Sequence, residues 1–173
     1  DDPLPAVVSP QLKSPTSGGS TGRPKLIVSG AVGDPAAIAQ LGRVMGVPEN
    51  GVCLITAALY HNASFSDALA ALTLGNTTVL MERFDPETTL KMIETHRATW
   101  VYAVPAMMQR IWKLPDDVKF GYDLSSVETF FHVAAPCPQW LKRAWIEWLG
   151  PEVIYELYGP TEGQAATALT GTE

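Results

Sequence analysis

The sequence predicts an α/β protein in which helices cover both faces of a mostly parallel sheet. Strand-like and helix-like segments alternate about every 25 residues beyond residue 31, which is typical of parallel strands joined by helical crossovers. The predicted strands are continuously apolar, as strands covered on both faces should be. Of the 173 residues, 46% are hydrophobic and 17% are charged, which suffices for one core. We therefore expect an extended lead-in over residues 1–30 and one α/β unit over residues 31–173.

Two predicted helices begin with the same signal. Asp34-Pro35 and Asp85-Pro86 each place a capping carboxylate before a proline at the first helical position. The first helix carries apolar residues at helical spacing, and the second runs to about His96. The other predicted helices span residues 66–74, 105–113 and 138–149, with Gly75 and Gly150 placed to end the first and the last of these.

The predicted strands lie between these helices. They span residues 52–56, 77–81, 99–104, 127–133 and 153–157. Residues 26–28 also resemble a strand, so the lead-in is expected to form a hairpin whose turn is the Gly-rich segment before them.

That Gly-rich segment, Thr16–Lys25, is the first candidate binding site. Seven of its ten residues are Gly, Ser or Thr, and it ends on a cation. Backbone N–H groups of such a loop can converge on an anion, and hydroxyls add further donors, so the composition favours phosphate binding. It differs from a P-loop, because Leu26 follows the lysine and a strand follows the loop. A flexible linker is the ordinary alternative.

Four further polar or small-residue segments follow predicted strands. Ligands of open α/β sheets bind beyond the carboxyl ends of the strands, so these segments are expected to meet at one edge. Tyr158 is suited to stacking on a base, Glu162 to binding Mg²⁺ and His61 to lining a pocket. Their ordinary alternatives are a core aromatic, a surface charge and a loop residue. The segments are Tyr60-His61-Asn62, Pro105-Ala106, Ala134–Pro136 and Tyr158–Glu162.

Composition excludes several classes of function. The net charge of −6 disfavours nucleic acid as a partner, and no apolar run approaches the length of a membrane span. The two cysteines lack metal or redox spacing, and Cys53 is expected to be a buried thiol. These features, together with the lack of a signal peptide, favour a cytoplasmic protein.

The helix over residues 138–149 carries three tryptophans that cannot share one narrow stripe. Either the helix packs on two sides, or one tryptophan covers a surface that a further part of the polypeptide would bury. The second arrangement would favour self-association. The residues are Trp140, Trp145 and Trp148.

Taken together, these motifs resemble the adenylate-forming (AMP-binding) superfamily of acyl-CoA synthetases, adenylation domains and luciferases. Ser17–Lys25 resembles its phosphate loop, with Gly18 at a usual Ser or Thr position, and Tyr158–Glu162 matches its Y-G-x-T-E motif. Val133–Pro136 resembles its adenine-side loop, with Val133 in place of Gly. Tyr60-His61-Asn62 and Val104-Pro105 resemble further family segments. The sequences of several segments most resemble those of bile-acid-CoA ligase-like and fatty-acid-CoA ligase-like enzymes.

The resemblance implies a role for each matched residue. Lys25 would contact the β- and γ-phosphates of ATP, Thr161 the α-phosphate, and Glu162 would bind Mg²⁺; these three are the catalytic candidates. His61, Asn62 and Gly163 would lie on the substrate side. The remaining nucleotide-binding candidates are Ser17, Gly18, Gly19, Ser20, Thr21, Gly22, Ala134, Ala135, Pro136, Glu156, Leu157, Tyr158 and Gly159.

The implied reaction has two steps. A hydrophobic carboxylic acid (fatty, sterol or bile acid) is joined to AMP, and coenzyme A then takes the acyl group. Family elements beyond residue 173, among them the mobile C-terminal domain, are not in this sequence, nor is the N-terminal subdomain. The resemblance therefore implies a central fragment of the large N-terminal domain, inactive as a ligase without the rest of its own polypeptide. An adenylation module that loads a carrier protein, and a non-catalytic nucleotide-binding remnant, are alternatives.

Overall fold

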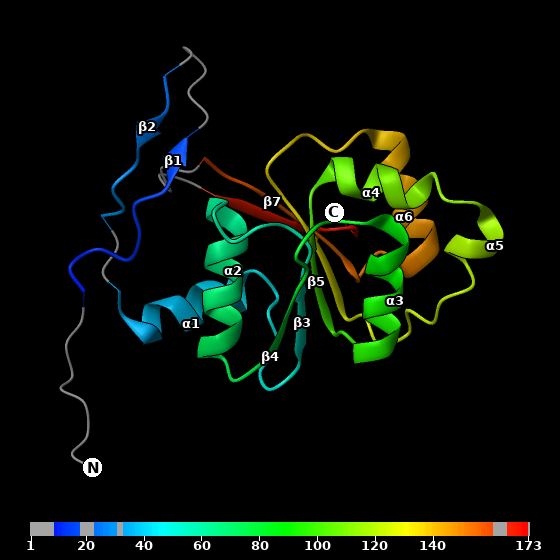
Figure 1. The fold of residues 1–173 in the computed structure, drawn as a ribbon, viewed down its shortest axis with the longest axis horizontal. Coiled ribbons are helices and arrows are strands. Elements are labelled where there is room, and N and C mark those ends of the chain that lie inside the picture. Colours follow the sequence, from blue (N-terminus) through cyan, green and yellow to red (C-terminus); the bar gives the residue numbers. More distant parts are fainter. Residues whose placement is uncertain (1–8, 18–22, 31–32, 161–165, 173) are drawn as a thin grey trace.

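The computed structural model describes residues 9–17, 23–30, 33–160 and 166–172 (Figure 1). Its main feature is a six-stranded sheet in the order β4-β3-β5-β6-β7-β8. Strands β3 to β7 are parallel, and β8 pairs antiparallel with β7 at the edge. The strands are β3 (Val52–Ile55), β4 (Thr77–Leu80), β5 (Trp100–Ala103), β6 (Thr129–His132), β7 (Ile154–Tyr158) and β8 (Thr167–Thr170). The predicted α/β fold with a mostly parallel sheet is confirmed.

The lead-in forms the predicted hairpin strands. β1 (Thr16–Ser17) pairs antiparallel with β2 (Lys25–Leu26). Two backbone hydrogen bonds continue the ladder, from Ile27 N to Pro15 O and from Ser29 N to Lys13 O. The Gly-rich turn itself, residues 18–22, lies outside the described residues.

The helices begin where the sequence signals place them, with one exception. Asp34 accepts a hydrogen bond from Ala36 N at the start of α1, and Asp85 accepts one from Thr88 N at the start of α3. Helix α2 begins at Asn62 instead of residue 66, without a side-chain cap. The short helix α5 and strand β8 were not predicted. The helices are α1 (Pro35–Val44), α2 (Asn62–Thr73), α3 (Pro86–His96), α4 (Pro105–Trp112), α5 (Asp116–Lys119) and α6 (Gln139–Leu149).

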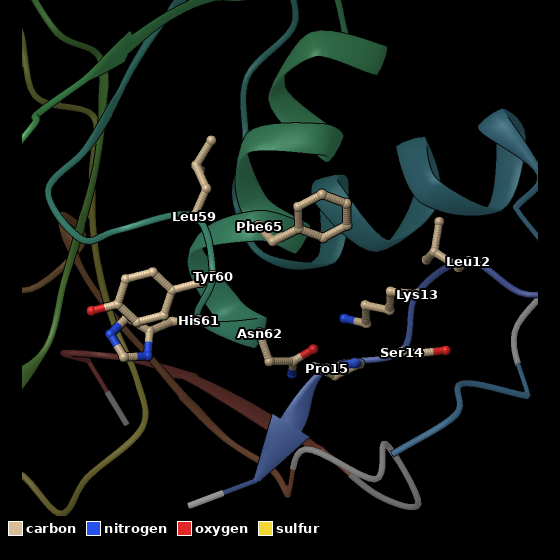
Figure 2. A pocket seen from close by; sticks show the side chains of 9 residues that line it. All are labelled: Leu12, Lys13, Ser14, Pro15, Leu59, Tyr60, His61, Asn62 and Phe65. Carbon is tan, nitrogen blue, oxygen red and sulfur yellow. The ribbon is translucent and has the colours of Figure 1, made fainter. Parts of the chain in front are cut away.

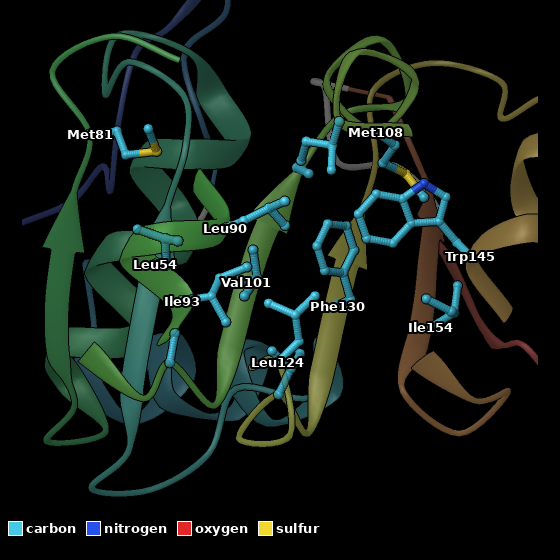
Figure 3. Close-up of a cluster of buried hydrophobic side chains, with 14 of the residues drawn as sticks. Leu54, Met81, Leu90, Ile93, Val101, Met108, Leu124, Phe130, Trp145 and Ile154 are labelled. Atoms are coloured by element: carbon cyan, nitrogen blue, oxygen red, sulfur yellow. The ribbon is translucent and has the colours of Figure 1, made fainter. Parts of the chain in front are cut away.

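Helices cover the sheet on both faces. Figure 1 shows α1 and α2 on one side and α3, α4 and α6 on the other. The first side packs around Trp100 and Phe131, whose rings stack with centroids 5.3 Å apart. The second side packs around Phe130 and Trp145, with centroids 4.3 Å apart (Figure 3). Because neighbouring residues of one strand point to opposite faces, Phe130 and Phe131 serve one core each.

The tryptophans of α6 have three different environments. Trp145 is fully buried, Trp148 is half-buried against Trp112 and Phe120, and Trp140 is 50% exposed. Of these three tryptophans, Trp140 is the one exposed enough to take part in self-association. Self-association itself stays a prediction. Cys53 is buried and unbonded, as predicted.

The described helices offer no segment long and apolar enough to cross a membrane. A cytoplasmic location stays a prediction.

Candidate functional site

The helical connections change from one face of the sheet to the other between the neighbouring strands β3 and β5. The chain leaves β3 for α2 on one face and leaves β5 for α4 on the other face. Such divergence opens a crevice in which α/β proteins bind ligands. Thr56 links the ends of these two strands, because its Oγ1 donates to the carbonyl oxygen of Tyr102 over 2.6 Å.

The hairpin closes one side of this edge. Figure 1 shows it at the end of the sheet where the parallel strands finish, beside the start of α2. A cavity of about 250 Å³ lies between the lead-in and the loop before α2 (Figure 2). Its walls come from residues 12–15 and from Leu59, Tyr60, His61, Asn62 and Phe65. The predicted substrate-side residues His61 and Asn62 therefore border a cavity, next to the strand that leads into the Gly-rich segment.

Polar groups gather beside this cavity. The Nζ atom of Lys13 donates a hydrogen bond to the hydroxyl of Ser66 on α2. Asp67, the next residue, is 1% exposed, and its Oδ2 has no partner among the described residues. Burial raises the pKa of Asp67 to about 8, against the opposing effect of Lys13. Asn62 Oδ1 is likewise buried without a described partner. Neither Lys13 nor Asp67 lies in a motif that the sequence predicts to be functional.

The predicted adenine-side segments lie next to one another. His132 at the end of β6 is in register with Glu156 on β7, so the residues after each strand leave the sheet side by side. Ala134, Ala135 and Pro136 are exposed, and Tyr158 is 80% exposed at the end of β7. The core-aromatic alternative for Tyr158 is therefore wrong.

An ion pair connects these two segments and was missed in the sequence. Lys142 on α6 pairs with the Glu156 carboxylate, and its Nζ lies 3.2 Å from His132 Nε2. No motif in the sequence singled out His132, and a lysine one turn into a helix gives no sequence signal of its own.

The predicted residues fall into two groups. Described residues are Ser17 and Lys25 on the hairpin, His61 and Asn62 at the cavity, 134–136 after β6, and 156–159 at the end of β7. Gly18, Gly19, Ser20, Thr21, Gly22, Thr161, Glu162 and Gly163 lie outside the described residues, so their contacts stay predictions. Among the described residues no cluster of His, Cys, Asp or Glu could hold a metal ion, and the predicted Mg²⁺ ligand Glu162 lies outside these residues.

The fold and these strand-end segments define an α/β domain suited to binding a nucleotide or a similar anion. Residues 15–173 match the family described as AMP-binding enzyme, and the chain belongs to that family.

Named relatives are CoA ligases. The chain is 31% identical over 162 residues to a 4-coumarate–CoA ligase of Pinus taeda, covering 90% of this chain and 29% of that protein. It is 29% identical over 153 residues to a 2-succinylbenzoate–CoA ligase of Arabidopsis thaliana, covering 88% and 27%. A putative acyl-CoA synthetase, YngI of Bacillus subtilis, is 35% identical over 104 residues, covering 60% and 18%. The chain thus spans less than a third of the length of these relatives.

Solved structures agree on the fold. The N-terminal domain of FACL13 from Mycobacterium tuberculosis superposes with a TM-score of 0.76 at 20% identity, covering 96% of this chain and 42% of that one. The amide bond synthetase McbA from Marinactinospora thermotolerans gives 0.73 at 28% identity, covering 88% and 30%. The predicted superfamily is confirmed; the closer likeness to bile-acid or fatty-acid ligases is not supported by the curated relatives.

Proposed function

We propose that this chain forms the nucleotide-binding part of an ATP-dependent acyl-CoA ligase. The adenine would lie between residues 134–136 and the ring of Tyr158, and the phosphates would lie along the Gly-rich segment up to Lys25. The observation that carries the proposal is the exposed ring of Tyr158 beside a loop of small residues. A solvent-exposed aromatic ring at the end of a strand can stack on a base.

The chemistry proposed is acyl activation. The substrate carboxylate attacks the α-phosphorus of ATP, and pyrophosphate leaves. The thiol of coenzyme A then attacks the acyl carbonyl, and AMP leaves. The protein's contribution is to orient the reactants and to neutralise charge, for which Lys25, Thr161 and Glu162 with Mg²⁺ are the candidates.

The acid is proposed to have an apolar body. Leu59 and Phe65 line the cavity beside His61, so a hydrophobic acid fits its walls. The relatives named for 4-coumarate and 2-succinylbenzoate favour an aromatic acid. The resemblance of the sequence motifs to bile-acid-CoA ligase-like enzymes favours a fatty, sterol or bile acid.

A nucleophile other than coenzyme A is a second candidate acceptor of the acyl group. The likeness to an amide bond synthetase at 28% identity favours an enzyme that forms the same acyl-adenylate but passes the acyl group to a different nucleophile. A carrier-protein thiol is the corresponding acceptor for an adenylation module. The nucleotide site would be the same in each case.

Calorimetric titration with acyl-sulfamoyladenosines tests the proposal, because these molecules imitate the acyl-adenylate. We expect each analogue to bind more tightly than AMP. Comparing the affinities of the coumaroyl, dodecanoyl and cholyl analogues then shows which class of acid the site prefers. Tyr158→Ala should weaken all of them about tenfold, the size of a lost base–aromatic contact. Tyr122→Ala, which removes a tyrosine bonded to Glu87 away from this edge, is the matched control. Failure of every analogue to bind would refute the proposal.

A further inference from the structure

The cavity between the lead-in and the start of α2 contains a cation without a carboxylate partner among the described residues. Lys13 lines this cavity and is half-buried on the lead-in. Its Nζ donates a hydrogen bond to Ser66 Oγ, and it takes no part in the ion pairs that the described residues form. A cation removed from water without a counterion is costly, so Lys13 would gain from an anion in the cavity.

Asp67 does not neutralise this cation at neutral pH. It follows Ser66 on α2, is 1% exposed, and has no described partner for its Oδ2. Burial raises the pKa of Asp67 to about 8, so the carboxyl is mostly protonated below that pH. Burial lowers the pKa of Lys13, and the nearby Asp67 opposes this effect only in part. Lys13 therefore remains an uncompensated charge beside the cavity.

Asn62 adds a second polar group at the same place. Its side chain lines the cavity, and its Oδ1 is buried without a described hydrogen-bond partner. Figure 2 shows the side chains of Lys13 and Asn62 pointing toward one another. Turning the carboxamide over would offer an N–H donor in place of the oxygen. Lys13 and Asn62 can therefore bind one anionic group together.

The wall beside these two residues is apolar. Leu12, Leu59 and Phe65 line the cavity, and Leu59 and Phe65 are 40% and 38% exposed. Their apolar surfaces are thus open to a ligand, which would remove them from water on binding. A ligand with an apolar body and an anionic end matches these walls.

Lys13 lies away from the segment along which the phosphates are proposed to bind. The hairpin ladder runs from Ser17, which is paired with Lys25, to the carbonyl oxygen of Lys13, which accepts from Ser29 N. Four steps of extended chain separate Lys13 from Ser17, which amounts to about 13 Å. A carboxylate that attacks the α-phosphorus would therefore not be the group that Lys13 binds.

We propose that Lys13 determines the substrate class of this cavity: together with Asn62 it binds a second anionic group, at the end of an apolar acid opposite to the reacting carboxylate. The inference rests on the proposed acyl-activating function, and it makes a dicarboxylic acid the preferred substrate. A charge-assisted hydrogen bond to the second group should change affinity about tenfold.

The first measurement needs no nucleotide. Benzoate and benzamide have nearly the same shape and differ in charge, and their binding is followed by NMR at the amides of residues 12–14 and 59–66. We expect benzoate to bind about tenfold more tightly than benzamide, Lys13→Met to remove this preference and Lys13→Arg to keep part of it. Lys91→Met, which removes an exposed lysine of α3, is the matched control for net charge. Equal binding of the two probes by the wild type, or a preference that survives in Lys13→Met, would refute the anion site.

The second measurement fixes the orientation of the acid by attaching it to the nucleotide. Calorimetry compares 4-carboxybenzoyl-sulfamoyladenosine with its 4-carbamoylbenzoyl counterpart, and the flexible 5-carboxypentanoyl analogue with its amide. We expect the carboxylate of each pair to bind about tenfold more tightly, and Lys13→Met to equalise the pair. If all four analogues bind without such a preference, the substrate class is refuted and the proposed function stands. If none binds, the proposed function and this substrate class are both refuted, and the benzoate titration still reports whether Lys13 binds an anion.

Discussion

Replacing Asp67 by asparagine should remove most of the loss of stability that this domain suffers between pH 6.5 and pH 8. Asp67 is 1% exposed on α2. Burial raises its pKa to about 8, and Lys13 limits the rise. In the unfolded chain the pKa is about 4, so across this range the folded state holds a proton that the unfolded state has released. Stability therefore falls as pH rises, up to the folded pKa.

The size of the effect follows from proton linkage. The free energy of unfolding should fall by about 1.4 kcal/mol per pH unit, hence by about 2 kcal/mol between pH 6.5 and pH 8. Below pH 6.5 His132 opposes this trend. Its pKa is lowered to about 4, so there the unfolded state binds the extra proton and acidification destabilises the fold. The two slopes cancel between about pH 4 and 6.5.

Urea unfolding followed by tryptophan fluorescence, at half-unit pH steps, measures this directly. Trp100 and Trp145 are buried and report unfolding of the two faces. Asp85 and Asp123 have lowered pKa values and are ionised in both states above pH 6.5, so they do not obscure the window. Asp67→Asn should show a flat free energy of unfolding from pH 6.5 to 8. A wild type that is itself flat there, or a variant that keeps the fall, would refute the reasoning.

Three further predictions concern the caps, the surface and the activity. Asp85→Ala removes the acceptor for Thr88 N and should lower the free energy of unfolding by about 1 kcal/mol in the same urea assay, whereas Glu87→Ala should cost less; equal losses would contradict the capping role. Trp140→Ser should reduce self-association measured by sedimentation velocity and leave stability nearly unchanged, since Trp140 is 50% exposed; undiminished association would show that another surface is used. This chain, which spans less than a third of the length of its curated relatives, should release no pyrophosphate from ATP with coumarate, dodecanoate or cholate; robust acyl-CoA formation would contradict this prediction.

Much of the fold could be predicted because local chemistry and tertiary packing agree. Asp34-Pro35 and Asp85-Pro86 start helices by capping, and apolar strands report burial on both faces. The start of α2 was missed because no side chain caps the helix, and its first turn is held by the loop just before it, where Ser64 Oγ donates to the carbonyl of Ala58. β8 was missed because it is a half-exposed edge strand whose pairing with β7 is antiparallel.

The candidate site was predictable only where a residue carries its own signal. Tyr158 ends a strand and His61 follows one, each in a recognisable motif. Lys142, Lys13 and Asp67 act through partners that lie far away in sequence, such as Glu156 for Lys142 and Ser66 for Lys13. Their roles depend on which helix face meets which strand, and a single sequence does not specify that pairing.

We propose that segments distant in sequence form one nucleotide site at the carboxyl edge of the sheet. An NMR titration of the chain with Mg·ATP, following backbone amides, tests it most directly. We expect shifts at Ser17–Lys25, Ala134–Ala135 and Glu156–Glu162 together, with amides of α3 and α5 unchanged. Saturating ATP that moves none of these amides, or that shifts only one segment, would contradict it.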